Sequence, residues 1–131
     1  SKYWNPIKAT YLPQNIALVI ADWKFNGGWK PKYLQHILGI PETNKMDKQT
    51  IMSVWEYIQN DPMKEQDLAQ KLISRRQKYL ESLKTKNKHH KKVPLINYNR
   101  GWYNRLNELK ESVTENTQEN LEKLKQIQNP D

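Results

Sequence analysis

The chain has 131 residues, a formal net charge of +8, five Trp and no Cys. This length supports one domain with one core, and the lack of cysteine excludes disulfides, thiolate zinc sites and cysteine nucleophiles. The positive charge favours polyanionic partners such as nucleic acid, anionic headgroups or the carboxylates and phosphates of a bacterial wall. The longest apolar run, Ile16–Ala21, is far below the roughly 20 residues of a membrane span, and no signal peptide is visible.

The first half of the chain predicts two helices bounded by proline and glycine. Pro13 suits the first turn of a helix whose apolar stripe ends at Gly27-Gly28. A second helix is expected from about Pro31 to Gly39. Neither segment alternates long enough to predict a strand.

Two further helices follow. Asp47 is a plausible N-cap for a third, which should end before Pro62. The fourth is expected from about Met63 to Leu83, with an apolar side formed by leucines, an isoleucine and a tyrosine. The predicted class is therefore all-α, a compact bundle of about five helices.

The segment from Lys84 to Lys92 holds five Lys and two His in nine residues and reads as a mobile loop. After it, Val93–Ile96 should be extended and a last helix should begin near Arg100. That helix turns almost wholly polar after Val113. We expect a domain over 1–113 and a polar helical tail over 114–131 that folds back, pairs with another chain or extends into solvent. Pairing would give self-association through the tail.

The sequence lacks the residues that several common kinds of functional site require. Gly27-Gly28 is not followed by the lysine and hydroxyl of a phosphate-binding loop. The three histidines form no helical pair at metal-ligand spacing, so neither a metal nor a cofactor is expected. Asp22 lies between Ala21 and Trp23 on an apolar stripe, which loosely fits a glycosidase carboxylate. The alternative is structural, with Asp22 accepting hydrogen bonds from backbone or Trp donors beside the glycine turn.

An ordered set of residues is similar to one known family. In chain order it comprises Tyr3-Trp4, Ile16-Ala17 to Asp22-Trp23, Asn26-Gly27, Leu34–Gly39, Asp47 with Thr50, Arg75-Arg76 with Tyr79, and Gly101–Arg105. This set resembles the C-terminal portion of glycoside hydrolase family 108, the lysozyme-like N-acetylmuramidases of phages and bacteria, which is classed as a predicted peptidoglycan-binding domain. The resemblance covers about Tyr3 to Leu109. It implies a lysozyme-like C-terminal half and peptidoglycan as the partner.

The resemblance carries no catalytic role into this chain. The family's catalytic glutamate lies near the enzyme's N-terminus, and no position here matches it. The implied function is therefore the wall-binding part of a muramidase, with catalysis upstream, or a stand-alone wall-binding or helical interaction module. The start at Ser1 suggests that sequence is missing upstream. Action at the bacterial envelope or periplasm, or by a phage protein at the wall, follows from the same resemblance.

The chain departs from the family within the matched region. The family's Asp-Gly-x-x-Gly-Pro-x-Thr turn appears as Asn44–Thr50, without either glycine or the proline. The Lys84–Lys92 segment also looks longer than usual. If the missing glycines allow close approach to sugar, binding at that turn is in doubt.

Sugar recognition needs aromatic faces for C–H surfaces and polar groups for hydroxyls, acetamides and carboxylates. The expected substrate-binding residues are Asn26, Trp29, Trp102, Tyr103 and Arg105, with Asp22 and Trp23 as structural or cleft residues. The alternative is that Trp102 and Arg105 lock the last helix against the fourth. Arg75, Arg76 and Arg105 would then pair with carboxylates or helix C-termini.

A second hypothesis, less favoured, is a small basic nucleic-acid-binding protein. It would place the lysines of the basic loop on phosphates and exposed tryptophans on bases. The expected polyanion contacts, whichever polymer is bound, are Lys84, Lys86, Lys88, Lys91 and Lys92.

Overall fold

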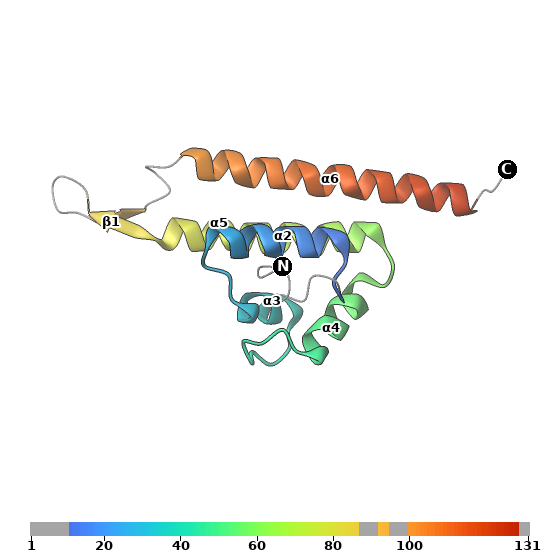
Figure 1. Ribbon diagram of the computed structural model, residues 1–131, viewed down its shortest axis with the longest axis horizontal. Helices are drawn as coiled ribbons and strands as arrows, with labels where there is room; N and C mark the ends of the chain where they lie inside the picture. The colour runs from blue at the N-terminus through green and yellow to red at the C-terminus, as the bar shows by residue number, and fades with distance from the viewer. Residues whose placement is uncertain (1–10, 87–91, 95–99, 129–131) are drawn as a thin grey trace.

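The computed structural model describes residues 11–86, 92–94 and 100–128, with side chains described over 11–83 and 101–127. In that part five helices and one short hairpin follow each other (Figure 1). They are α2 (Gln14–Asn26), α3 (Pro31–Leu38), α4 (Lys48–Ile58), α5 (Pro62–Ser82), β1 (Lys84–Lys86), β2 (Lys92–Pro94) and α6 (Arg100–Gln128). The predicted all-α class and the helical bundle are confirmed.

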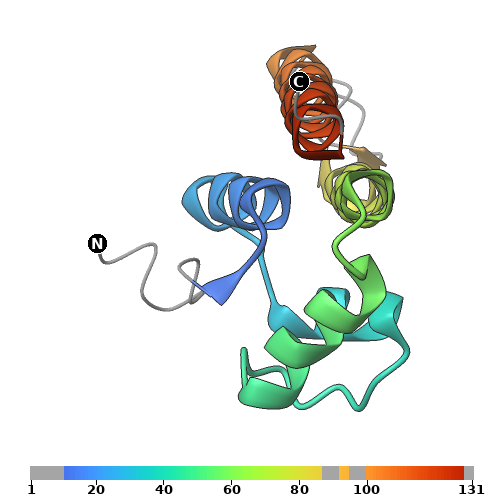
Figure 2. The same ribbon diagram turned by 90° about the vertical axis from the view of Figure 1, so that its right-hand side faces the viewer.

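The helices form two layers. α2, α5 and α6 lie side by side along the long axis of the molecule, and α3 and α4 cover them from one side (Figure 1). Seen end-on, α2, α5 and α6 form a triangle with α6 at its apex (Figure 2). The buried core draws its apolar side chains from all five helices.

The helix ends follow the expected capping chemistry with small shifts. Pro13 is the N-cap of α2 rather than its first helical residue, and its carbonyl accepts the first helical bond from Ala17 N at 2.9 Å. Gly39 ends α3 in the left-handed region at φ 71°, as expected of a C-terminal glycine. Asp47 caps α4, accepting from Thr50 N at 2.9 Å. Asp61 does the same for α5 through Met63 N.

The core is centred on Trp23 of α2, which is fully buried. Its ring lies 5.2 Å from Tyr33 in a parallel stack, 5.2 Å from Trp29 edge-on and 6.1 Å from Tyr79. Aromatic rings at these separations attract each other beyond the area they bury. The cluster joins α2, α3, α5 and the turn between α2 and α3 into one body.

The basic segment is not entirely a loop. Lys84–Lys86 and Lys92–Pro94 pair as antiparallel strands, with Thr85 opposite Val93. Both residues are β-branched, a type that favours extended backbone, and the expectation of a loop is corrected at these strand positions. The extended conformation predicted for Val93 and Pro94 is confirmed, while Leu95 and Ile96 lie outside the described residues.

α6 runs without interruption across the expected boundary between 113 and 114. Thr117 beyond it is fully buried, and its Oγ1 accepts from Asn15 Nδ2 at 3.5 Å. Asn116 Nδ2 donates to Asn15 Oδ1 at 2.9 Å. The first residues of the polar tail therefore continue α6 and contact α2 through hydrogen bonds between buried or part-buried polar groups. Nearer the end, Ile127 is 72% exposed, and self-association through the tail stays a prediction.

Candidate functional site

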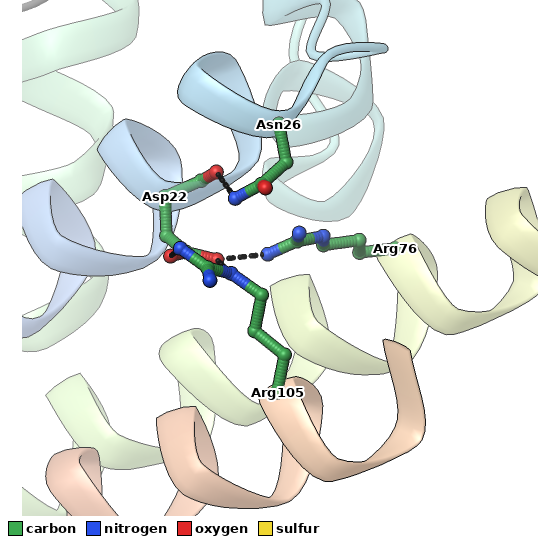
Figure 3. Close-up of polar contacts among 4 residues, drawn as sticks. All are labelled: Asp22, Asn26, Arg76 and Arg105. Atoms are coloured by element: carbon green, nitrogen blue, oxygen red, sulfur yellow. Dashed lines mark hydrogen bonds and ion pairs between the residues drawn. The ribbon is translucent and has the colours of Figure 1, made fainter. Parts of the chain in front are cut away.

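Three helices meet at the carboxylate of Asp22 (Figure 3). Arg76 Nη1 of α5 donates to Asp22 Oδ2 at 2.5 Å, and Arg105 Nη2 of α6 donates to Asp22 Oδ1 at 2.8 Å. The side chain of Arg76 is 4% exposed, that of Asp22 18% and that of Arg105 46%. One acid thus holds one buried and one half-exposed arginine, which leaves a local excess of one positive charge.

The electrostatics keep Asp22 ionised. Burial alone raises the pKa of the Asp22 carboxyl, but hydrogen bonds from Arg105 and Arg76 and their positive charges bring that pKa below its ordinary 3.8. A carboxylate with a lowered pKa holds no proton at neutral pH and cannot supply one to a leaving group. The structure therefore places Asp22 as an anchor between helices. Its carboxylate partners are arginines, not the backbone or Trp donors expected from sequence.

A cleft of about 250 Å³ opens beside this ion pair. It lies between the turn that follows α2, the second half of α5 and the start of α6. Its lining residues are Asn26, Gly27, Gly28, Arg76, Tyr79, Leu80, Leu83, Trp102 and Arg105. The wall therefore combines aromatic and aliphatic surface with an amide and two guanidinium groups.

The glycine turn shapes one wall of the cleft. Asn26 Nδ2 donates to the Asp22 carbonyl at 2.7 Å, which holds the exposed Asn26 side chain at the end of α2 (Figure 3). Gly28 has φ +95°, and a Cβ there would overlap the ring of Tyr79. Glycine is needed at this position both for the backbone conformation and for the close approach of Tyr79.

The structure brings three of the five expected sugar-binding residues together. Asn26, Trp102 and Arg105 line the cleft. Trp29 is 8% exposed and packs edge-on against Trp23, so it belongs to the core. Tyr103 lies outside the lining, half-buried, with its hydroxyl donating to Glu81 Oε1 at 3.5 Å.

The other residues singled out from the sequence are Trp23 and the five lysines expected to contact a polyanion. Trp23 is structural, at the centre of the core. The backbones of Lys84, Lys86 and Lys92 lie on the hairpin. Lys88 and Lys91 lie outside the described residues.

A buried network around Gln35 escaped sequence reasoning. Gln35 Nε2 donates to Thr43 Oγ1, Thr50 Oγ1 and the Lys45 carbonyl at 2.9–3.0 Å, and Oε1 accepts from Asn44 N at 2.9 Å. The network holds the loop between α3 and α4, where Asn44 has φ 60°. Asparagine tolerates this left-handed conformation, which explains how the loop between α3 and α4 turns at Asn44 without a glycine there. The one sequence feature that could have indicated this network is a glutamine within an otherwise apolar stripe of the helix.

Comparisons with known proteins add no identification, since no family model, no curated protein and no solved structure matches the chain. Within the described ranges, no helix has the length and apolarity needed to cross a membrane. No group of three or more His, Asp or Glu side chains in that same part is arranged to hold a metal ion.

Proposed function

We propose that this chain is a peptidoglycan-binding domain of the family 108 muramidase type, and that it holds the glycan in the cleft between the Gly27-Gly28 turn and the start of α6. On this proposal the chain contributes binding and part of a cleft wall, and a glutamate upstream of it performs general-acid catalysis. A stand-alone wall-binding relative would use the same cleft.

The observation that carries the proposal is the convergence of Asn26, Trp102 and Arg105 on one cleft. These residues come from segments more than 70 positions apart in the chain. Trp102 is half-buried against the core and also lines the cleft, where its ring supplies apolar surface for the C–H face of a sugar ring. Asn26 and Arg105 supply donors for an acetamide or hydroxyl group at the rim.

The charge of the cleft also fits a wall fragment. Arg76 and Arg105 share the single carboxylate of Asp22, so the excess positive charge favours a glycan that carries carboxylates. Arg105 is the accessible member of the pair, and it keeps hydrogen-bonding capacity beyond its contacts with Asp22. The net charge of +8 would further favour encounter with an anionic wall.

Co-sedimentation with purified sacculi, stripped of phosphate polymers, tests the proposal. The folded wild-type chain should sediment at moderate salt. Trp102→Ala should weaken binding by about tenfold, since an aromatic contact contributes on the order of 1.5 kcal/mol.

Trp55→Ala is the matched control, because Trp55 is 45% exposed and lies on α4, away from the cleft. It should bind sacculi as the wild type does. If the folded wild-type chain does not sediment with sacculi, the proposed peptidoglycan binding is contradicted. If Trp102→Ala and Trp55→Ala weaken binding equally, the proposed position of the binding site in the cleft is contradicted.

A further inference from the structure

A second, cationic groove lies between α3 and α5. It consists of two adjoining depressions of about 710 and 330 Å³ that share His36 and Arg75. None of its lining residues lines the cleft beside Asp22. It is therefore a separate surface, which we call the α3–α5 groove.

The charges of the groove are only partly compensated. Asp67 pairs with Lys71 at 3.2 Å, and Glu42 contacts His36 at 3.4 Å, a contact that balances the Glu42 charge only when the imidazole is protonated. Within the described part of the chain, no carboxylate lies within ion-pair distance of Lys32, Arg75 or Lys78. With His36 neutral, the four Lys and Arg side chains of the groove outnumber its two acids by two, so the groove carries a net positive charge that favours an anionic ligand.

The cations of α5 form a row. Lys71, Arg75 and Lys78 follow each other at intervals of four and three residues, so they share one face of the helix. The helical rise puts their Cα positions about 6 Å and about 4.5 Å apart along the axis. Because Asp67 already pairs with Lys71, Arg75 and Lys78 are the uncompensated members of the row. Two cations in line along a helix match a chain of repeated anions better than a single anion.

Arg75 is held in place by an aromatic ring. Its guanidinium carbon lies 4.4 Å from the centroid of Tyr33, and Tyr33 stacks on Trp23 with an interplanar angle of 6°. A stacked guanidinium is ordered before the ligand arrives and still directs its N–H groups to phosphate oxygens. The same contacts engage the Tyr33 ring.

The contacts that already occupy the Tyr33 ring favour a polyanion without bases over a single-stranded nucleic acid. Proteins that bind single-stranded nucleic acid without sequence preference combine a basic groove with aromatic rings on which bases stack. His36, whose imidazole contacts Glu42, and Tyr33 are the aromatic residues that line the described groove, and Arg75 and Trp23 already contact the Tyr33 ring. The groove thus offers charge without an unengaged Trp, Tyr or Phe ring for base stacking.

We propose that the α3–α5 groove binds a phosphodiester polymer built on small polyols, the chemistry of teichoic acids. The assignment of phosphate rests on the groove itself. The choice of a polyol polymer rests also on the proposed function, because a bacterial wall presents such polymers beside its glycan.

Calorimetric titration with poly(glycerol phosphate) at several salt concentrations tests this inference. The wild-type chain should bind, with affinity falling as salt rises. The double variant Arg75→Gln/Lys78→Gln should bind more weakly, and its log–log salt slope should be smaller by about 1.4, roughly 0.7 for each lost phosphate contact.

The control Lys24→Gln/Lys48→Gln removes the same charge from exposed positions outside the groove. It should keep the wild-type slope. Because Arg75 packs on Tyr33, a second pair, Lys32→Gln/Lys78→Gln, repeats the test without disturbing that contact. Equal slope changes in groove and control variants would overturn the inference.

Two further measurements distinguish binding of a polyol phosphate polymer from binding of nucleic acid and from binding at the cleft. Single-stranded DNA of equal charge that binds as tightly as poly(glycerol phosphate) would overturn it in favour of nucleic acid. Trp102→Ala should bind the polymer normally, while the groove variants should bind phosphate-free sacculi normally. Failure of the cleft and failure of the groove are thus distinguishable.

Discussion

Asp22 and Arg105 lie 83 positions apart in the chain, yet their side chains meet through a hydrogen bond of 2.8 Å. With Arg76 on the same carboxylate, this contact ties α6 to α2 and α5. It also fixes the side of the cleft on which Trp102 lies. The anchor and the proposed binding site are therefore parts of one arrangement.

Asp22→Asn should destabilise the fold by about 3 kcal/mol, because the buried Arg76 would lose its charged partner. Urea denaturation measures the change in the free energy of unfolding. Glu122→Gln is the control, since Glu122 pairs with Lys125 on the exposed side of α6 and should matter little. A loss at Asp22 no larger than at Glu122 would contradict the anchor.

The contribution of Asp22 should depend on pH. Its pKa is lowered in the folded state from 3.8, so the unfolded chain binds the proton more readily. The stabilisation is therefore complete well above pH 3.8 and is lost as pH falls through the folded pKa. The gap in unfolding free energy between wild type and Asp22→Asn should narrow below about pH 4. A gap that stays constant down to pH 2 would refute the pKa shift.

Gly28→Ala should cost about 2–4 kcal/mol, since it combines an unfavourable positive φ with an overlap on the Tyr79 ring. Gly27 has φ +93°, and a Cβ there would have no neighbour within 4 Å. Gly27→Ala should therefore cost only the strain of a positive φ, about 1 kcal/mol. Thermal and urea unfolding compare the two. Adding Tyr79→Leu should recover part of the loss at Gly28 only; equal costs at both glycines would argue against the close approach.

Gln35→Ala should destabilise the chain by about 3 kcal/mol, because one buried and three part-buried hydrogen bonds of the fully buried Gln35 are lost. The exposed Gln49→Ala on α4 serves as control. Hydrogen exchange at the Asn44 amide gives a local measurement and should accelerate in Gln35→Ala. An unchanged Asn44 amide would show that the network does not hold the loop.

Removal of residues 114–131 should destabilise the domain by about 2 kcal/mol, since the buried Asn15 side chain would lose Asn116 and Thr117 as partners. Removal of 125–131 leaves those partners in place and should have a small effect. The unfolding midpoints of the two truncated chains decide whether the division at 113/114 is structural. Equal midpoints would support the division.

Features set by local chemistry were predictable from the sequence. The Asp47 cap needs only an acid three positions before Thr50, and the end of α3 needs only a glycine that accepts a left-handed backbone. Of the five residues selected for sugar binding, the fold places Asn26, Trp102 and Arg105 on one cleft and leaves Trp29 and Tyr103 outside it.

Features set by distant contacts were not predictable in the same way. The burial of Trp29 depends on how Trp23 and Tyr33 stack across two helices. The packing of Thr117 depends on Asn15, about 100 positions earlier. The polar run after Val113 left the packing of the tail open, because nothing in its own sequence reveals that partner.

The most direct test of the cleft is an NMR titration of the isotope-labelled chain with a soluble disaccharide–peptide fragment of peptidoglycan. The account predicts that shift changes concentrate at the Trp102 indole N–H, the Asn26 side-chain amide and the Arg105 guanidinium, while the Trp55 indole stays unchanged. Shift changes centred elsewhere, or none at concentrations where sacculi bind the chain, would contradict the claim that this cleft holds the glycan.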